Sequence, residues 1–287
     1  MACCLQDFLL HGAPDLAMER EERRRHADLL HVAWTRQIHL EIADWYFESI
    51  DDADVIILAG DIAKGSEGIT WAKRAMADRF PDKTFIYVAG NHEFYDAQLS
   101  LLRLFQESTS ETNGIQFLEN QVLVHGNVRF LGSTLWSDFT LYGQDAIEAC
   151  MAAASRYLMD FRKIERSGGV LLTPADLPAL HQQAVQWLDK ELSKSFDGKT
   201  VVVTHFAPHR NCIAPQYKGD LLTPYFVNDL SWMMEKFPID VWCFGHTHHN
   251  VDFIAEGGCR VVSNQVGYPM ERFKNEHNFR ADLVLEL

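Results

Sequence analysis

The chain has 287 residues, of which 47% are hydrophobic, and its formal net charge is -14. This length and composition fit a globular chain with one large domain or two small ones, and we interpret it as one. The acidic balance disfavours a protein that holds long nucleic acid by neutralising its phosphates, but it is compatible with a small phosphorylated substrate. No apolar run approaches the length of a transmembrane helix, so we expect no membrane association.

The cysteines and the first residues of the chain give two further expectations. The six cysteines form no CxxC pair and follow no regular spacing, which is typical of reduced thiols and predicts a cytoplasmic protein. Residues 1–34 include a mixed-charge run at 19–25 that we interpret as a solvated helical face. We therefore divide the chain into an N-terminal extension of unassigned role, 1–34, and a domain at 35–287.

Hydrophobic periodicity, caps and turn residues predict alternating strands and helices along most of the chain. Apolar, β-branched runs predict the strands, and Pro, Gly and Thr-Pro pairs bound several helices. In chain order we expect a strand at 30–35, a strand at 55–59, a helix at 66–80, a strand at 85–88, a helix at 96–111, a hairpin at 121–131, a loop at 132–139, helices at 144–161 and 174–193, a strand at 201–204, a helix at 224–236 and strands at 241–244, 251–254, 260–263 and 283–287.

Four of these strands end at polar residues instead of ordinary turn residues. The residues that follow them are Gly60-Asp61, Gly90-Asn91-His92-Glu93, His205 and Gly245-His246-Thr247-His248-His249. The carboxyl edge of an α/β sheet is where such proteins place their chemistry. Core packing alone does not call for this set of side chains, so we interpret it as a functional site.

These motifs, in this order and with these gaps, resemble the calcineurin-like metallophosphoesterases over roughly residues 35–287. The resemblance implies an α/β fold, a four-layer α-β-β-α sandwich of two mixed sheets flanked by helices, with a metal site at one edge. It also implies a hydrolase with two divalent ions, for which manganese is our first expectation and Fe, Zn, Co or Ni are alternatives. A hydroxide that bridges the ions would attack a phosphomonoester or phosphodiester of a small molecule or nucleotide.

The resemblance also implies a role for individual residues. Asp61 would bridge the two ions, and His92 would act as general acid or stabilise the transition state. The implied ligands of one ion are Asn91, His205 and His246, and those of the other are Gln37, His39 and His248.

The first motif of the family departs from its usual form in this chain. Gln37 stands where the family has the Asp of Asp-x-His, and His39 matches the His. The pair Asp28 and His31 is the alternative, but side chains three apart on a strand face opposite ways. An amide oxygen can bind a hard ion but brings no charge, so we expect a weakened site. This substitution keeps a second hypothesis open, a catalytically impaired relative that only binds its ligand.

Several other residues have a structural explanation that we prefer to a functional one. Glu93 is expected to serve the turn, and the remaining polar and aromatic candidates are expected in the core, in turns or at the surface. These candidates are Tyr95, Trp136, Asp138, His209, His249 and Asn264. The segment 60–65 lacks the second Asp and the Arg of the Ser/Thr protein phosphatases, which argues against that branch of the family. A single-metal hydrolase of another type is the weakest alternative, because both the Gly-Asn-His-Glu and the Gly-His-Thr-His motifs are intact.

Overall fold

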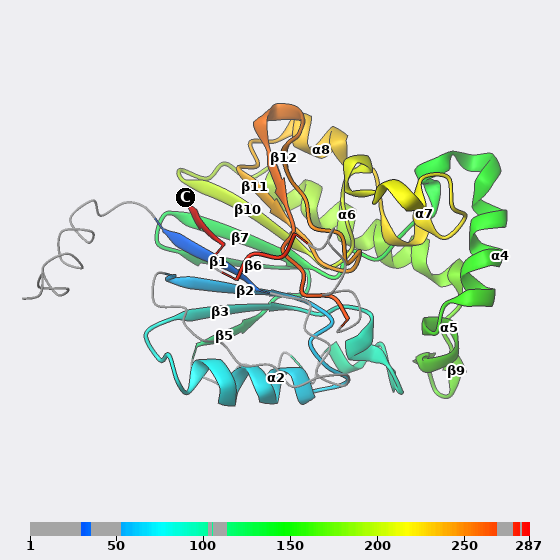
Figure 1. Ribbon diagram of the computed structural model, residues 1–287, viewed down its shortest axis with the longest axis horizontal. Coiled ribbons are helices and arrows are strands. Elements are labelled where there is room, and N and C mark those ends of the chain that lie inside the picture. Colours follow the sequence, from blue (N-terminus) through cyan, green and yellow to red (C-terminus); the bar gives the residue numbers. More distant parts are fainter. Residues whose placement is uncertain (1–29, 36–52, 103–104, 106–113, 269–277, 282) are drawn as a thin grey trace, which may run out of the picture.

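The computed structural model describes residues 30–35, 53–102, 105, 114–268, 278–281 and 283–287. Two mixed β-sheets lie face to face at its centre, with helices around them (Figure 1). This arrangement confirms the predicted α/β fold, in which helices flank two mixed sheets. Every helix in the described ranges is too short or too polar to span a bilayer.

The first sheet has five strands in the order β14-β1-β2-β3-β5. Four of them are parallel, and β14 pairs antiparallel with β1. Their bounds are β1 (His31–Thr35), β2 (Val55–Ala59), β3 (Thr84–Val88), β5 (Ile115–Phe117) and β14 (Val284–Glu286). Since β1 begins at His31, the sheet already includes residues that precede the domain start expected at residue 35.

The second sheet has six strands in the order β12-β13-β11-β10-β7-β6, of which the two edge strands are antiparallel to their neighbours. Their bounds are β6 (Gln121–His125), β7 (Val128–Ser133), β10 (Lys199–Thr204), β11 (Val241–Cys243), β12 (Asp252–Ile254) and β13 (Arg260–Val262). The β6–β7 pair is the predicted hairpin, although β7 extends two residues into the predicted loop.

Strand alternation assigns the core side chains to two layers. Along β2, Val55, Ile57 and Ala59 belong to the cluster packed between the two sheets, whereas Ile56 and Leu58 belong to the cluster under the helices. Successive side chains of a strand point to opposite faces, and here both faces are buried. This explains why β2 is a continuous apolar run instead of an alternating one.

Helices and a small third sheet complete the fold. The α-helices are α2 (Glu67–Ala72), α4 (Ile147–Tyr157), α5 (Asp160–Lys163), α6 (Leu177–Leu192), α7 (Thr223–Phe226) and α8 (Ser231–Lys236), and η1 (Lys73–Ala77) is a π-helical turn. The 3₁₀ turns are η2 (His92–Phe94), η3 (Thr140–Tyr142), η4 (Gln144–Ala146), η5 (Pro174–Asp176), η6 (Arg210–Cys212), η7 (Pro215–Tyr217) and η8 (Glu256–Gly258).

The third sheet contains β4 (Ala97–Gln98), β8 (Ile164–Ser167) and β9 (Val170–Leu171). In Figure 1, α4, α5 and α7 lie together beyond one end of the two large sheets.

The helix expected at 96–111 is wrong at its start. Asp96 has φ 61°, a left-handed conformation that cannot begin an α-helix. Its backbone N–H donates to the Lys163 carbonyl at 2.8 Å, and the next residues form β4, which pairs with β8. Helical structure begins only at Leu101, and residues 106–111 lie outside the described residues.

Two other expected helices are interrupted. The helix expected at 144–161 ends at Tyr157 because Leu158 is extended, with φ -88° and ψ 140°, and α5 then starts at Asp160. The helix expected at 224–236 is divided into α7 and α8, because Val227 is extended and forms a bridge to Ala207.

Candidate metal centre

Four of the residues expected to bind metal converge on one point at the carboxyl ends of β2, β3, β10 and β11. His205 Nε2 lies 3.3 Å from Asp61 Oδ2, 3.1 Å from Asn91 Oδ1 and 3.1 Å from His246 Nδ1. All four side chains are buried. The structure therefore brings together residues from distant parts of the sequence, since Asp61 and His246 are 185 positions apart.

The hydrogen bonds around this point leave lone pairs directed toward one another. His205 Nδ1 lies 2.8 Å from the Ala59 carbonyl and donates its hydrogen to it. In the neutral ring, Nε2 therefore carries a lone pair that can accept a hydrogen bond or bind a metal. The Asn91 amide nitrogen donates to Asp160 at 3.1 Å, which turns Asn91 Oδ1 toward His205. A cation satisfies such a set of facing acceptors.

The chemistry of the cluster fits a divalent metal ion. Its donors are imidazole nitrogen, amide oxygen and carboxylate oxygen without a thiolate, a mixture that suits Mn, Fe, Zn, Co or Ni. His246 Nε2 is buried and has no hydrogen-bond partner in the part of the chain that the structure describes. Asp61, His205 and His246 offer ligand atoms that all lie within 4.8 Å of one another.

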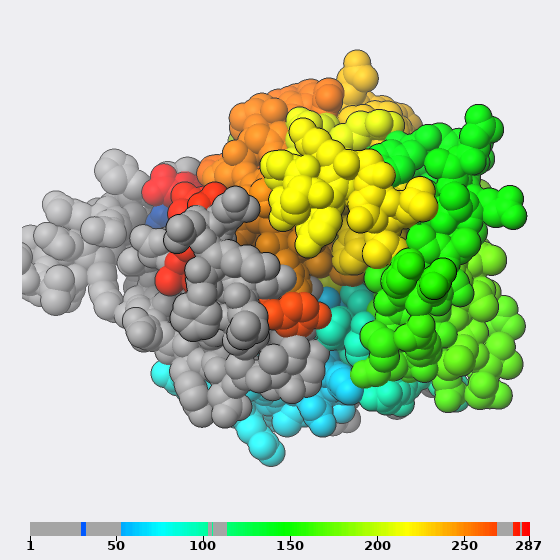
Figure 2. All heavy atoms as spheres, turned by 45° about the vertical axis from the view of Figure 1, so that its right-hand side comes forward, coloured from blue at the N-terminus to red at the C-terminus, as the bar shows by residue number. Residues whose placement is uncertain are grey.

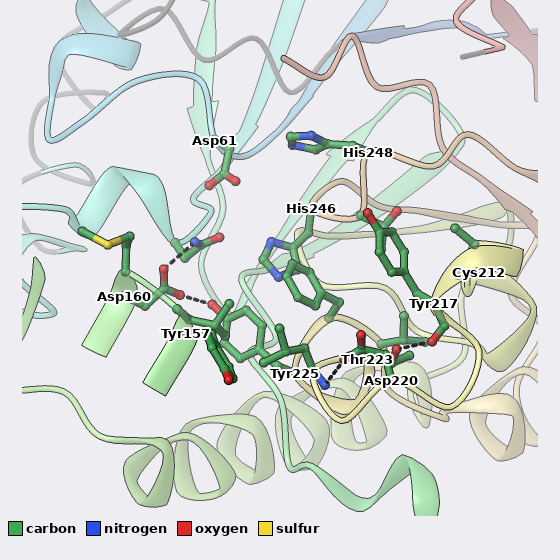
Figure 3. Close-up of a pocket in the computed structure, with 18 of the residues that line it drawn as sticks. Asp61, Tyr157, Asp160, Cys212, Tyr217, Asp220, Thr223, Tyr225, His246 and His248 are labelled. Carbon is green, nitrogen blue, oxygen red and sulfur yellow. Dashed lines mark hydrogen bonds between the residues drawn. The ribbon is translucent and has the colours of Figure 1, made fainter. Parts of the chain in front are cut away.

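The second expected ion site is described in part. Asp61 and His248 line the same cavity, and in Figure 3 the His248 ring points toward Asp61. The His248 ring packs edge-on against Tyr268, with ring centroids 4.6 Å apart. Gln37 and His39 lie outside the described residues.

Glu93 holds the turn that presents Asp61, as the sequence predicts. Its carboxylate accepts hydrogen bonds from the backbone of Asp61 at 2.9 Å, Ile62 at 2.7 Å and Gly90 at 2.7 Å, and from the Tyr87 hydroxyl at 2.9 Å. Asp61 has φ 53°, so these bonds stabilise a left-handed conformation that an aspartate seldom adopts. Burial, followed by the nearby Asp61 charge, raises the pKa of Glu93.

Two motif glycines are needed because the backbone passes close to the ligands. A Cβ atom at Gly90 would lie 2.2 Å from Asp61 Oδ1 and 2.6 Å from His205 Cε1. Gly60 has φ 84°, and a Cβ there would lie 2.5 Å from His205 Nδ1. Glycine therefore allows β2, β3 and β10 to deliver their ligands to one point.

A buried carboxylate that the sequence did not reveal lies behind the ligands. Asp160, the first residue of α5, accepts hydrogen bonds from the Asn91 amide, from the Tyr95 hydroxyl at 2.6 Å and from the Tyr225 hydroxyl. The His92 ring stacks on Tyr95 with centroids 4.3 Å apart. No local motif surrounds Asp160, so sequence reasoning had no signal to find it.

Burial and mutual charge shift the pKa values of these groups. Burial raises the pKa of Asp160, and burial followed by the Asp160 charge raises the pKa of Tyr95. Burial, followed by the neighbouring His205, lowers the pKa of His246 far below its usual range. Burial acts to lower the pKa of His205, but the Asp61 carboxylate, the Ala59 carbonyl and the Glu93 charge together outweigh it, and the pKa is raised. The ring of His246 is thus held in the neutral form that binds metals.

A cavity of about 420 Å³ opens beside the cluster, a size typical of small-molecule sites. Asp61, Asn91, His92, His246 and His248 line it, as do residues of the 157–160 and 212–227 segments. Figure 2 shows the surface hollowed where the yellow residues around α7 meet the green residues around α4. The cluster therefore faces an accessible space in which a ligand can bind.

The other candidates have mostly structural contacts. Tyr95 is buried in the core, as the sequence favoured, and it also lines the cavity. Trp136 packs between Phe94 and Phe206, and the Asn264 amide donates to the Arg280 carbonyl. The Asp138 carboxylate accepts from the backbone and hydroxyl of Thr140, and the His209 ring lies 3.1 Å from Glu256. The other five candidates are absent from the described cavity lining; they are Trp136, Asp138, His209, His249 and Asn264.

Comparison with known proteins finds one matching family model and several similar chains. The family model described as calcineurin-like phosphoesterase matches residues 30–250. A protein of Acanthamoeba polyphaga mimivirus, named uncharacterized protein L509, is 27% identical over 270 residues, which are 84% of this chain and 92% of that protein. The crystal structure of a phosphopantetheinyl hydrolase from Mycobacterium tuberculosis has a similar fold, with a TM-score of 0.65, 18% identity and coverage of 91% of this chain and 96% of that chain. A dimetal phosphatase from Danio rerio matches with a TM-score of 0.47 and 16% identity, over 82% of this chain and 87% of that chain.

Proposed function

The chain belongs to the calcineurin-like phosphoesterase family and is a metal-dependent phosphoester hydrolase. We propose that its substrate is a phosphomonoester or phosphodiester of a small molecule. The observation that carries this proposal is the convergence of Asp61, Asn91 and His246 on His205 Nε2 at the wall of a cavity. The net charge of -14 supports a small substrate over long nucleic acid.

The ligand assignment in this proposal rests partly on the described donors and partly on the sequence motifs. Asn91, His205 and His246 would hold one divalent ion, and Asp61 would contribute to both. His248 would belong to the second set, which His39 and Gln37, outside the described residues, would complete. When bound, two such ions stabilise negative charge on the phosphoryl group and supply hydroxide from water near neutral pH. We place manganese first and Fe, Zn, Co or Ni as alternatives, since the donor set contains nitrogen and oxygen without sulfur.

His92 is proposed to act on the leaving group. Its backbone N–H donates to Asp61 Oδ1 at 2.9 Å, and its ring stacks on Tyr95 and lines the cavity. These contacts hold the imidazole in the cavity next to Asp61, beside the ions that Asp61 would help to bind. From there a ring nitrogen can donate a proton to the leaving-group oxygen or stabilise its developing charge.

The cellular compartment belongs to the same proposal. The four described cysteines, Cys150, Cys212, Cys243 and Cys259, are buried and unpaired. Free thiols of this kind are typical of a reducing compartment, which supports the cytoplasm.

The test couples metal content to turnover. Purified protein reconstituted with Mn²⁺ is assayed for bound metal by mass spectrometry and for hydrolysis of nitrophenyl mono- and diesters, with Asp61→Asn as the matched control. We expect close to two ions per chain and turnover that the control loses. Absence of turnover on both esters, with two ions bound, would refute the hydrolase assignment.

The alternative, a relative that binds its ligand without catalysis, has one specific observation in its favour, the Gln37 at the first motif. It predicts one ion or none in the native chain. Under that alternative, Gln37→Asp adds the missing carboxylate, and both the second ion and turnover then appear. If Gln37→Asp changes neither metal content nor rate, Gln37 is not the cause of a weak site.

A further inference from the structure

The cavity beside the metal cluster has two chemically different ends. In Figure 3, Asp61, His246 and His248 stand at one end, and Asp220, Thr223 and Tyr157 stand at the other. A phosphoryl group that meets the cluster therefore leaves the rest of the substrate to occupy the far end. The composition of the far end indicates what that part of the substrate is.

The walls of the far end are mainly apolar. They come from the junction between α4 and α5 and from the segment that precedes α7, and their apolar members include Leu158, Met159, Ile213 and Leu222. Phe226 of α7 also lines the cavity, but its ring stacks on His246 at the cluster end, with centroids 4.7 Å apart. Three large side chains of the lining are also unusually exposed, Tyr157 at 61%, Tyr217 at 54% and Met159 at 43%. A ligand with apolar surface would cover them, and burying that surface favours binding.

The same walls offer little to a second anionic group. Among the described residues that line the cavity there is no lysine or arginine, and the acidic members are Asp61, Asp160 and Asp220. A second phosphate or a carboxylate placed at the far end would find no cationic side chain there and would approach Asp220. The described lining thus selects against substrates with several charges.

The wall is held in place by its own hydrogen bonds. The Thr223 hydroxyl donates to the Tyr217 carbonyl at 2.6 Å, and the Leu222 backbone N–H donates to Asp220 Oδ1 at 2.8 Å. The Gly219 backbone N–H donates to the Tyr142 hydroxyl at 3.0 Å, which ties this segment to η3. A preformed wall retains its selectivity because little conformational entropy is lost on binding.

From these observations, and resting on the proposed function, we propose that the far end binds an uncharged, largely apolar leaving group. The preferred substrate is then a phosphoester of an alkyl or aryl alcohol with a single phosphate, and not a nucleoside polyphosphate. This assigns the walls at 157–159 and 213–223 to substrate selection.

Binding of hydrolysis-inert phosphonates tests the inference independently of turnover. Calorimetry on the Mn²⁺-reconstituted protein compares methyl-, butyl- and hexylphosphonate with 6-phosphonohexanoate, in which a carboxylate replaces the terminal methyl group of hexylphosphonate. We expect affinity to rise about threefold for each added methylene and to fall at least about tenfold when the carboxylate replaces the methyl group. Equal affinity along the series, or tighter binding of the carboxylate compound, would overturn the inference.

Charge placement in the wall gives a second readout. Leu222 is a half-buried residue of the wall. Leu222→Lys should lower the affinity for hexylphosphonate about tenfold and raise the affinity for 6-phosphonohexanoate. Val124→Lys, at a site on β6 that is 57% exposed and outside the described lining, is the matched control and should leave both affinities unchanged. Ile213→Lys repeats the test if the first variant fails to fold. An unchanged preference in folded Leu222→Lys or Ile213→Lys would contradict the assignment.

Turnover separates this inference from the function on which it rests. If phosphonates bind with the expected preference but hexyl phosphate and nitrophenyl esters are not hydrolysed, the proposed function fails and the apolar site stands. If hexyl and methyl phosphate are hydrolysed with equal kcat/KM and the phosphonates show no preference, the function stands and the apolar site is refuted.

Discussion

Asn91 and Asp160, which are 69 residues apart in the chain, are joined by a 3.1 Å hydrogen bond from the side-chain amide to the carboxylate. This bond directs the Asn91 oxygen toward His205 and the metal cluster. Asp160 therefore acts as a positioning residue for a ligand. Mutation of partners of this kind typically lowers metal affinity by about 10–100-fold.

Asp160→Ala should lower the affinity for the first ion by about 10–100-fold, because the Asn91 amide is then free to rotate. A metal-competition titration with a chromophoric chelator measures the change. Tyr225→Phe is the matched control, since it removes a hydroxyl from the same carboxylate and leaves the Asn91 bond in place. Equal loss of affinity in both variants would show that general destabilisation, and not the orientation of Asn91, is responsible.

Glu93→Gln should destabilise the fold by about 2–4 kcal/mol, because its new amide donors would face backbone and hydroxyl donors. Urea denaturation measures the loss. Glu165→Gln serves as a comparison, because Glu165 accepts its bonds at the surface, and it should change stability by less than about 1 kcal/mol. Similar losses in the two variants would contradict the structural role given to Glu93.

His92→Ala should reduce kcat by about 10²–10⁴-fold while leaving metal content unchanged, since the imidazole is proposed to act on the leaving group and not on an ion. Steady-state kinetics and metal analysis on the same sample measure both quantities. His209→Ala, at a histidine paired with Glu256, should retain the wild-type rate. A loss of metal in His92→Ala would instead point to a role as ligand.

Removal of divalent ions should lower the melting temperature, because the charge of Asp61 and the facing lone pairs of His205, Asn91 and His246 are then uncompensated. At a hundredfold excess of metal over Kd, binding contributes about 2.7 kcal/mol to stability. Differential scanning fluorimetry with MnCl₂ or chelator measures the shift. In Asp61→Asn the shift should shrink, and a shift of wild-type size would exclude Asp61 as a ligand.

Glu119 should make stability fall as pH rises through neutrality. Burial raises its pKa from 4.5 to about 7, although hydrogen bonds from the Thr134 side chain and backbone oppose this. A carboxyl with a raised pKa binds its proton more tightly in the folded state, so the stabilisation present below pH 4.5 is lost as the pH approaches 7. We expect a loss of about 1–3 kcal/mol between pH 5 and pH 8 from this group. Denaturation of Glu119→Gln at the two pH values should show a smaller difference than the wild type, and an equal difference would refute the role of this carboxyl.

The main strands and the motif residues at their ends were predictable from the sequence. A strand that is buried on both faces, such as β2, is a continuous apolar run in the sequence. The glycine that follows β2 marks the place where the backbone becomes left-handed. These are local properties, set by a few neighbouring residues. The same holds for the capping box of Thr173 and Asp176 before α6.

Expectations that depended on distant contacts were less reliable. Asp96 was expected to begin a helix, but a hydrogen bond to Lys163 and pairing with β8 hold the following residues extended. Val227 was expected inside a helix, but its bridge to Ala207 ends α7 there. Helix propensity is a weak preference, and tertiary pairing overrides it.

By itself, the sequence predicted the main strands and the polar residues at their ends, because hydrophobic periodicity and short motifs encode both. The resemblance of those motifs to a known family implied the two mixed sheets. Only the tertiary structure decided what surrounds the polar residues. It placed Asp160 of α5 behind Asn91 and placed the apolar wall around Leu222 at the far end of the cavity that opens beside the cluster. Neither contact has a local signature, because each depends on how separately folded segments pack together at the ends of the sheets.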